Sequence, residues 1–533
     1  MAAARLGLDL APLALRRPRL AVELARANRR DPRDPAMIPL LDRAIAVRPS
    51  RVLRQRRAEL LATAGELSAA AAAWRDLGGA HPGATVAQRV RVLEGRLRET
   101  EVEPVWLPDL GPEVEPLAPA SKRRILHVLK SAAPERWSGF TIRTLQDLRA
   151  QREAGLDPVV VTQLGWPREV GVTEVEPQST FEGFQQWHLD RGPAYRPRSL
   201  PPDVALQDNA EAFMPVVREV RPAILHVHSG YRGGELVLAA LALRKRFGIP
   251  VVYEVRGLFE AVWSSDPRYN ESAELYRRRL AFETEVLHEV DGACVISEAL
   301  LEEIVARGVD RSKLTLIPNG IDPSALDRAE RDPVLRSQLG LDGRLVVGYL
   351  GNLDHWREGI DVLLRALAEL RARGREDVAV LVVGDGTRRD EWERLARTLG
   401  LADRVRFTGR VPHEQVAQYY SQMDLFANPR VDERAARLIT PLKPYEAMAL
   451  GLPVLVSDLP ALREIVDPPH RGAVAPPGDA AGLADAIARL LDDPAERARL
   501  GEAGRDWVRR ERTWAANGAR YRAAYERILG PLD

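Results

Sequence analysis

The sequence predicts an α/β protein in which two doubly wound parallel-sheet domains face each other across a cleft, preceded by an all-α region. Short apolar runs rich in β-branched residues alternate with amphipathic helical patterns from residue 123, and a second series of the same kind starts at residue 345. Strands that alternate with helices in this way form parallel sheets covered on both faces. Before residue 100 such runs are absent, and Ala, Leu, Arg and Glu recur at helical spacing.

Length, composition and charge narrow the function classes. A chain of 533 residues is too long for one core and should divide into roughly three domains. Hydrophobic residues make up 45% and charged residues 29%, which is typical of a folded, soluble protein. The net charge of +1, with both signs interspersed, leaves no basic stripe for a nucleic acid. No apolar stretch approaches the ~20 residues that span a bilayer, and the amino terminus lacks a signal-peptide centre, so we expect a cytoplasmic protein with no indicated peripheral membrane contact.

The first 120 residues form the predicted helical region and its linker. Pro49 and Pro82 lie 33 positions apart, and Gly65 separates two apolar helical patterns between them. This period resembles a tetratricopeptide repeat of two readable units, and an Ala-rich helical hairpin without repeat character is the alternative. A protein partner, if the chain has one, would bind through residues 1–120. Residues 101–120 are rich in Pro and Glu without any period, so we expect an extended linker there.

The two predicted sheet domains occupy residues 121–325 and 326–510, and residues 511–533 form a terminal helix that can cross between them. The strands of the first series lie in RILHVLKS, DPVVVTQLG, AILHVHSG, PVVYEVRG, GACVISE and LTLIPNGID. Those of the second lie in LVVGYLGN, VAVLVVGDG, VRFTGRV, DLFANPR and PVLVSD. Ligands of open parallel sheets gather beyond the carboxyl ends of the strands. The polar residues that stand there are His228, Arg256, Asn352, Asp385 and Arg430.

A lysine between two prolines marks the predicted ligand site. Only five of the 77 basic residues are lysines, and one of them, Lys443, lies in TPLKPYEAMALGLPVLVS at 440–457. Pro441 and Pro444 restrain the loop, which should hold Lys443 outside a helix whose first turn contains Pro444. A restrained cation beside a helix N-terminus predicts a diphosphate site, and Glu446 in the first turn can accept hydrogen bonds from a ribose diol. Taken singly, a surface lysine and a first-turn glutamate are also ordinary structural features.

Residues 123–533 resemble the family 4 glycosyltransferases, most clearly over 290–470. The resemblance rests on the TPLKP segment together with VGYLGN, VVGDGTRRDEWERLA, RVRFTGRVPHEQVAQYYSQMDLFANP and IPNGID. It implies a GT-B fold built from two Rossmann-like domains. It also implies transfer of a sugar from a UDP- or GDP-sugar to a hydroxyl of a glycan, glycolipid or small molecule, with retention of anomeric configuration. Beyond the nucleotide-sugar donor it implies no cofactor and no bound metal.

The resemblance assigns site residues position by position. The expected catalytic residues are Lys443 at the donor diphosphate, His228 near the donor sugar and Arg256 in the same cleft. Glu446 would hold the ribose. The other expected donor-binding residues are Gly139 of a glycine-rich loop, the strand-end residues Asn352, Gly384 and Asp385, the pair Arg410 and Val411 beside the base, and Thr440, Pro441 and Leu442, whose backbone would face the donor sugar.

Two features depart from the family pattern. Many relatives carry a glutamate eight positions before Glu446, where this chain has Leu438. Many also place an arginine and a lysine in the loop after the first strand of the third domain, where GNLDHWREGID has Asn352 and Glu358. The donor phosphates would then depend on the remaining cations and on helix N–H groups.

Two other functions fit the same residues. A nucleotide-sugar epimerase of the same fold would convert the donor alone, without an acceptor. An inactive transferase-like scaffold that recruits partners through its helical region is favoured by Leu438, Asn352 and Glu358. A dehydrogenase fits poorly, because Arg389 takes the place of the third glycine in GDGTRR.

Three further predictions concern metals, the cysteine and the acceptor. Four histidines lack a partner at zinc-ligand spacing, so we expect no metal site. They are His226, His355, His413 and His470. The single cysteine, Cys294, lies in the apolar run GACVIS and should be buried. Residues 164–210, rich in Pro and aromatic residues, are expected to form an acceptor loop.

Overall fold

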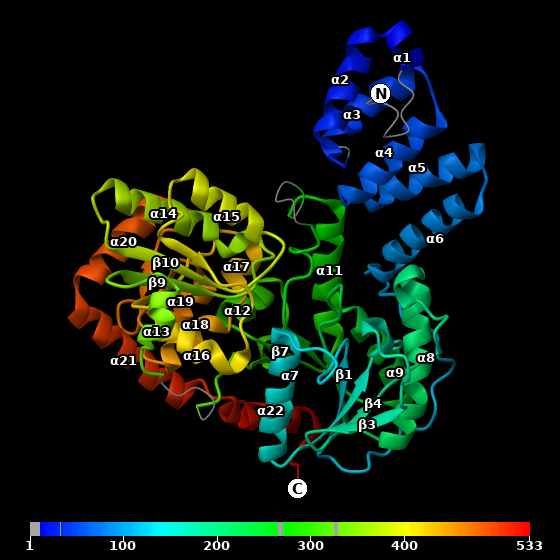
Figure 1. The fold of residues 1–533 in the computed structure, drawn as a ribbon. Helices are drawn as coiled ribbons and strands as arrows, with labels where there is room; N and C mark the ends of the chain where they lie inside the picture. Colours follow the sequence, from blue (N-terminus) through cyan, green and yellow to red (C-terminus); the bar gives the residue numbers. More distant parts are fainter. Residues whose placement is uncertain (1–10, 32, 265–268, 270, 324–328, 533) are drawn as a thin grey trace.

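The computed structural model describes residues 11–31, 33–264, 269, 271–323 and 329–532. A helical region and two sheet domains follow one another along the chain (Figure 1). The last helix, α22 (Trp514–Leu529), returns from the third domain to the second, where it lies beside α7 (Gly139–Glu153) (Figure 1). None of the helices in these ranges combines the length and apolar character that a bilayer crossing needs.

The helical region consists of helices packed around two apolar clusters. Its α-helices are α1 (Ala11–Arg16), α2 (Pro18–Arg30), α3 (Ile38–Val47), α4 (Arg51–Thr63), α5 (Leu67–Ala80) and α6 (Ala84–Glu99). One cluster surrounds Leu24 and Leu41, and the other surrounds Trp74 and Leu77. Gly65 joins α4 to α5 at φ +81°, a conformation that favours glycine. The predicted all-α region is therefore confirmed, whereas its tetratricopeptide character stays a prediction.

The second domain is built on a sheet in the order β3-β4-β2-β1-β5-β6-β7-β8. Its strands are β1 (Arg124–Leu129), β2 (Asp157–Thr162), β3 (Gln178–Phe181), β4 (Phe184–Trp187), β5 (Ile224–His228), β6 (Val251–Val255), β7 (Gly292–Val295) and β8 (Leu314–Leu316). Only β3 and β4 pair in antiparallel fashion among the described strands. One face packs on α8 (Pro202–Val220), α9 (Glu235–Phe247) and α11 (Glu274–Glu289), and the other on α7 (Gly139–Glu153) and α22 (Trp514–Leu529). α12 (Glu298–Ala306) follows β7.

The β3–β4 hairpin interrupts the segment that was expected to be a loop, residues 164–210. Glu182 and Gly183 have φ of +50° and +80°, the left-handed pair that two-residue hairpin turns require. Each strand has four residues, and three of the eight side chains are glutamines. Strands this short and polar show no apolar alternation, so the sequence pattern gives no signal for them.

The third domain is built on an all-parallel sheet in the order β11-β10-β9-β12-β13-β14. Its strands are β9 (Leu345–Leu350), β10 (Val378–Val383), β11 (Val405–Phe407), β12 (Leu425–Asn428), β13 (Val454–Ser457) and β14 (Ala473–Ala475). Its α-helices are α13 (Pro333–Gln338), α14 (Ile360–Ala372), α15 (Arg389–Thr398), α16 (Val416–Tyr420), α17 (Arg434–Leu438), α18 (Lys443–Ala449), α19 (Pro460–Val466), α20 (Ala480–Asp492) and α21 (Pro494–Glu511). The short β14 adds a strand to the five that the apolar runs predict.

The closing helix α22 covers the face of the second sheet on which site residues lie. The chain crosses at Ile321, whose N–H donates to the Arg512 carbonyl at 2.7 Å. Tyr521 and Tyr525 of α22 are fully buried beneath the sheet, in one cluster with Cys294. The prediction that Cys294 is buried is therefore confirmed.

The helical region is anchored to loops of the second domain. Glu99 of α6 pairs with Arg232, in the loop after β5, at 2.7 Å. Glu274, at the start of α11, accepts a hydrogen bond from Ser68 N at 2.8 Å. A side chain at Gly65 would collide with Trp263, in the loop after β6. The helices thus support the segments that follow β5 and β6 at the carboxyl edge of the sheet.

Candidate functional site

The TPLKP loop lies at the interdomain junction, where it meets the segments that follow β7 and β8. Thr440 is buried, and its hydroxyl donates to the Ile296 carbonyl at 3.2 Å. Its carbonyl accepts from Asn319 Nδ2 at 2.8 Å. A Cβ added to Gly139, the first residue of α7, would lie 3.9 Å from Leu442 Cδ1. The structure therefore brings Gly139, Thr440 and Leu442 together, although they come from different domains.

Lys443 and Glu446 form an ion pair at the start of α18. The Lys443 ammonium lies 2.8 Å from both carboxylate oxygens, and the Tyr420 hydroxyl donates to Glu446 Oε2 at 3.2 Å. Both side chains keep some exposure, 29% for Lys443 and 15% for Glu446. The helix begins at Lys443 after Leu442 as N-cap, so the expectation that Lys443 stands outside the helix is wrong. Pro444 in the second position needs no N–H partner, so the first turn can begin one residue before the proline.

Two arginines surround the glutamate that takes the place of a family cation. Glu358 is buried and receives Arg430 Nε at 3.2 Å and Nη2 at 3.1 Å. The Tyr349 hydroxyl donates to the same carboxylate at 3.1 Å. Burial disfavours the charged form of Glu358, but Arg430 and Arg357, with the Tyr349 hydroxyl, together outweigh burial and lower the pKa of the carboxyl. Arg430 is therefore committed to Glu358.

Arg357 is a further cation that sequence reasoning missed. It is 20% exposed, and its Nε lies 3.6 Å from Glu358 and 3.9 Å from Glu433, longer than hydrogen bonds. It directly precedes Glu358 in the motif WREG. The sequence therefore contains a cation, Arg357, one position before Glu358, the residue that stands where many relatives have a cation.

The loops after β9 and β10 lie backbone against backbone. Leu353 N donates to the Asp385 carbonyl at 3.0 Å, and Gly384 N donates to the Gly409 carbonyl at 3.1 Å. Gly384 has φ +140°, and a side chain there would collide with the Gly351 carbonyl. Only glycine fits at this approach.

The remaining predicted donor-site side chains lie at the surface of these loops. Asn352, Asp385 and Arg410 are exposed, and Val411 is half-buried against the third domain's core. Asn352 Oδ1 accepts from Asp354 N at 2.6 Å. The polar side chains are accessible to a ligand, and among the described residues no hydrogen bond or ion pair joins them to Lys443 or Glu446.

Leu438 belongs to the contact between the two sheet domains. It is 9% exposed and packs, with Ala435, into the apolar core of the second domain. The Ser297 hydroxyl donates to its carbonyl. Arg434, at the start of α17, pairs with Glu260 of the second domain at 3.2 Å. A glutamate in place of Leu438 would enter this apolar core, which explains the leucine.

Arg256 is buried beneath α7 rather than open to the junction. Its side chain is 4% exposed. Its donors reach Glu254 Oε1 at 2.8 Å, the Phe140 carbonyl at 3.2 Å, Thr144 Oγ1 at 2.6 Å and Asp147 Oδ2 at 2.8 Å. Arg143, on α7, lies 3.1 Å from the same Glu254. The two arginines fasten the first turns of α7 to β6, and with them the helix start at Gly139.

Three histidines stand together on the face of the second sheet that α7 and α22 cover. His127 on β1 and His226 and His228 on β5 are at most 1% exposed, and one nitrogen from each lies within 4.8 Å of the others. The expectation that His226 lacks such partners is wrong. Parallel pairing puts His127 beside His226 in register, although the two are far apart in sequence. His355 and His470 lie outside this cluster, and the side chain of His413 lies outside the described residues.

Hydrogen bonds determine which nitrogen of His226 carries the proton. Glu254 Oε2 lies 3.0 Å from His226 Nε2 and accepts a hydrogen bond from the Nε2–H group, so the Tyr525 hydroxyl donates to Nδ1 at 2.6 Å. Tyr521 also donates to Glu254, at 2.9 Å. Burial disfavours the charged form of Glu254, but Arg256 leads the groups that hold its pKa well below the usual value. The ring of His226 is neutral because burial lowers its pKa.

The same reasoning fixes His127 and His228. Gln151 Oε1 lies 3.0 Å from His127 Nε2, which must donate, so His228 Nε2 donates to His127 Nδ1 at 2.9 Å. Burial lowers the pKa of both imidazoles well below the usual value. His228 Nδ1 is left 4.0 Å from Glu254. A metal bound by the three rings would have to replace these hydrogen bonds, and neutral His228 is a weak base.

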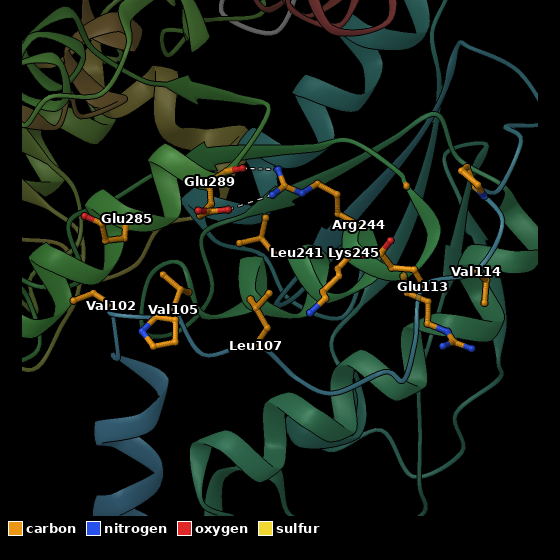
Figure 2. Close-up of a pocket in the computed structure, with 14 residues that line it drawn as sticks. Val102, Val105, Leu107, Glu113, Val114, Leu241, Arg244, Lys245, Glu285 and Glu289 are labelled. Carbon is orange, nitrogen blue, oxygen red and sulfur yellow. Dashed lines mark hydrogen bonds and ion pairs between the residues drawn. The ribbon is translucent and has the colours of Figure 1, made fainter.

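Two surface hollows of about 640 Å³ each differ in their relation to the sheets. The first lies beneath the linker, where Leu241, Arg244 and Lys245 near the end of α9 face Glu285 and Glu289 of α11 (Figure 2). Helices that end there lead into β6 and β7, so this groove lies at the amino edge of the sheet. The second is lined by segments 165–173 and 193–199, which follow β2 and β4. Only the second lies on the carboxyl edge, where ligands of parallel sheets gather.

Comparison with known proteins agrees with this geometry. Residues 138–320 match the model of the glycosyl transferase 4-like domain, and residues 344–493 match that of the glycosyl transferases group 1. The chain belongs to the family 4-like glycosyltransferases. The recognition made from the sequence motifs is thereby confirmed, and neither matched region includes the helical region.

Curated relatives are similar over part of their length. The chain is 32% identical to 2-deoxystreptamine glucosyltransferase of Streptomyces kanamyceticus over 260 residues, 47% of this chain and 64% of the relative. It is 35% identical to the GDP-mannose-dependent alpha-(1-6)-phosphatidylinositol monomannoside mannosyltransferase of Mycolicibacterium smegmatis over 210 residues, 38% of this chain and 54% of the relative. The chain thus spans less than two thirds of either relative.

Solved structures share the two-domain architecture. Sucrose-phosphate synthase from Thermosynechococcus elongatus superposes with a TM-score of 0.61 at 25% identity, covering 76% of this chain and 99% of the other. HepE of Anabaena in complex with UDP-glucose superposes with a TM-score of 0.56 at 16% identity, covering 76% and 100%. The predicted fold class, two GT-B sheet domains behind a helical region, is confirmed.

Proposed function

We propose that the protein transfers a sugar from a UDP- or GDP-sugar to an acceptor hydroxyl, with retention of anomeric configuration. The Lys443–Glu446 pair at the interdomain junction carries the proposal. A cation and a carboxylate on adjoining turns match the two parts of a nucleotide diphosphate, its phosphates and its ribose diol. The proposal is supported by a relative named for GDP-mannose and by the neighbour solved with UDP-glucose.

Binding of the donor would break the Lys443–Glu446 ion pair and replace it with contacts to the phosphate and ribose groups of the donor. The Lys443 ammonium would leave the carboxylate for a phosphate oxygen, and Glu446, held by Tyr420, would accept from the ribose hydroxyls. Arg357, whose Nε lies 3.6 Å from Glu358, would form a further ion pair with the donor phosphates. The backbone of residues 440–442 would face the sugar.

The loops of the third domain would receive the rest of the nucleotide. Asn352, Asp385 and Arg410 offer exposed polar groups at strand ends, and Val411 offers an apolar contact to the base. Gly384 allows the two loops to approach each other without a side chain between them. No cofactor beyond the donor and no metal enter this proposal.

The proposed reaction breaks the bond from the anomeric carbon to the phosphate oxygen and forms a bond from that carbon to the acceptor oxygen on the same face. Negative charge grows on the departing phosphate, where Lys443 and the start of α18 would stabilise it. The acceptor proton would pass to that phosphate. His228 is buried and neutral, and Arg256 is fastened to α7, so both would position other groups around the donor sugar.

Replacing Lys443 tests this assignment. We expect Lys443→Ala to lower kcat on the order of 10²–10³-fold, as loss of one oxyanion donor does in other enzymes. UDP or GDP at 100 times its Kd should stabilise the wild type by ~2.7 kcal/mol, read as a rise in Tm, and the variant less. Lys245→Ala, an exposed lysine in the groove at the amino edge of the second sheet, is the control. Unchanged turnover in Lys443→Ala refutes the phosphate site, and absence of any nucleotide stabilisation of the wild type refutes the transfer itself.

The structure gives no observation that favours the epimerase or the scaffold over transfer. Leu438 and Glu358, which suggested an inactive scaffold, have local explanations in the second domain's core and in Arg430. An epimerase would turn over the donor without an acceptor, which product analysis distinguishes. A partner for residues 1–120, the cytoplasmic location and the domain boundaries stay predictions.

A further inference from the structure

Lys130, the first residue after β1, lies in a cage of aromatic rings at the carboxyl edge of the second sheet. Its ammonium lies 4.3 Å from the ring centre of Phe140, 4.8 Å from that of Phe259 and 5.5 Å from that of Tyr231. All three distances are within the ~6 Å over which a ring face attracts a cation. The lysine and the three rings each keep partial exposure, so the cage is accessible from solvent.

The Lys130 ammonium forms no direct ion pair with a carboxylate of the described residues. It donates one hydrogen bond, to the Gly230 carbonyl at 2.8 Å, and no carboxylate of the described residues lies within 4.0 Å of it. Its other two N–H groups have no acceptor in that same part of the chain. Glu235 is the nearby acid; its Oε1 accepts from Tyr231 N at 2.6 Å and Arg232 N at 3.0 Å, and its Oε2 is buried without a hydrogen-bond partner among the described residues.

The environment of Lys130 leaves its ammonium largely protonated at pH 7 but only partly hydrated. Burial lowers the pKa of the ammonium to about 8, Glu235 opposes this shift, and Arg256 and Arg136 add to it. Most of the side chain is therefore still charged at pH 7. A cation that has lost part of its water attracts an anion more strongly than a fully hydrated one.

One side of the cage adjoins the proposed donor site. Phe140 follows Gly139 in the first turn of α7, and Gly139 faces Leu442 of the TPLKP loop. Phe140 also lies with its ring centre 4.9 Å from the Arg256 guanidinium, which anchors that turn. Lys130 is thus separated from the loop assigned to the donor sugar by a single turn of helix.

The other side of the cage adjoins the hollow at the carboxyl ends of β2 and β4. The Tyr231 hydroxyl donates to Glu169 Oε1 at 2.6 Å, and the Arg198 guanidinium lies 4.8 Å from the Tyr231 ring centre. Glu169 and Arg198 both line that hollow of about 640 Å³. Tyr231 therefore connects the cage with a space large enough for further sugar units.

We propose that Lys130 recognises an anionic group, a carboxylate or a phosphate, on the acceptor. The inference rests on the proposed transferase function and names the class of its acceptor. The unused N–H groups of Lys130 suit an anion, and the partly exposed faces of Phe140, Phe259 and Tyr231 suit a sugar ring beside it. Lys130 is then a specificity-determining residue that acts on the acceptor and leaves the donor site unchanged.

Pairs of acceptor probes that differ in charge test the inference. The carboxylate arm compares 4-nitrophenyl β-D-glucuronide with 4-nitrophenyl β-D-glucoside, and the phosphate arm compares mannose 6-phosphate with mannose. Saturating UDP or GDP blocks the donor site, so that a phosphate probe cannot bind there. Dissociation constants come from ligand-observed NMR. We expect the wild type to bind the charged member of one arm at least tenfold more tightly than its neutral twin, and the arm identifies the anion.

Three variants distinguish recognition of the anion by Lys130 from a purely structural role of its side chain among the three rings. Lys130→Met keeps the alkyl chain and should erase the charge preference, whereas Lys130→Arg should retain it. Lys245→Met removes the same charge from the groove at the opposite edge of the sheet and should change nothing (Figure 2). Since Lys130→Met removes a partly buried charge, we expect its Tm not to fall. A preference that survives in Lys130→Met, or a fall in Tm of both Lys130 variants without a change in preference, overturns the inference.

The outcome is distinguishable from failure of the transferase proposal. If neither UDP nor GDP stabilises the wild type, the proposed function fails, and the inference fails with it. If a nucleotide binds and the wild type makes no distinction between charged and neutral twins, only the assignment of Lys130 is overturned.

Discussion

The two sheet domains hold their charged site residues in different ways. In the third domain, Lys443 and Glu446 lie three positions apart on one helix, keep some exposure and satisfy each other. In the second domain, Arg143, Arg256 and Glu254 come from a helix and a strand end and are buried together. A local, exposed pair can exchange its partner for a ligand at little cost. A buried network cannot, and its role is to fix the backbone around it.

The buried network depends on one carboxylate. Glu254 is fully buried and accepts from two guanidinium groups, from His226 and from Tyr521. Burial alone would raise its pKa, but Arg256, His226 and Arg143 together outweigh burial and hold the pKa well below the usual value. Removing it would leave two guanidinium groups buried without this shared partner, and burying an uncompensated charge is costly.

The largest expected effect is therefore that of Glu254→Ala on stability. Loss of one partner from a buried ion network costs about 3–5 kcal/mol, to be measured as the free energy of unfolding of the second domain in urea. Asp458→Ala, which breaks an exposed pair with Arg463, should cost less than about 1 kcal/mol. Glu254→Gln keeps one acceptor and serves if the alanine variant does not fold. Equal costs for Glu254→Gln and Asp458→Ala would remove the distinction between the two domains.

The exposed pair should behave in the opposite way, with a small effect on stability and a larger one on the donor. Glu446→Ala should lower the free energy of unfolding by less than the ~3–5 kcal/mol expected for Glu254→Ala, because Lys443 is 29% exposed and can turn to solvent. A hydrogen bond to a charged group contributes about 1.5–3 kcal/mol, so KM for the nucleotide sugar should rise roughly 10–150-fold. Asp458→Ala is again the control. A donor KM that stays at the wild-type value would show that Glu446 does not hold the ribose.

The same contrast explains which site residues could be predicted from the sequence. Lys443 and Glu446 are readable because both lie in one motif with a helix start. The histidine cluster is not, since His127 reaches His226 only through the pairing of β1 with β5. A search for zinc ligands at short spacing cannot find partners that a sheet brings together.

The fold shows a similar division. The apolar runs predict the parallel strands of both sheets because buried parallel strands are almost continuously hydrophobic. The β3–β4 hairpin and β14 escape this criterion, because strands of four or three residues are too short to show a period, and each hairpin strand has two or more polar residues. The leucine at position 438 is understood only once α17 is seen to pack on the second domain, since its partners there belong to another part of the chain.

The smallest expected effect concerns pH and would sharpen the comparison from the acceptor side. The pKa of Lys130 is lowered to about 8, so the charged form falls from roughly nine tenths at pH 7 to roughly one tenth at pH 9. Preference for the charged acceptor probe, measured as the ratio of dissociation constants with its neutral twin, should accordingly fall roughly tenfold over this range. The probes do not cause the change, because a phosphate ester has its second pKa near 6 and a carboxyl titrates lower still. Lys130→Arg cannot lose its charge here, so its preference should stay constant from pH 7 to 9. If the wild-type preference is equally constant, Lys130 does not recognise the anion, and its role is only to pack against its three aromatic rings.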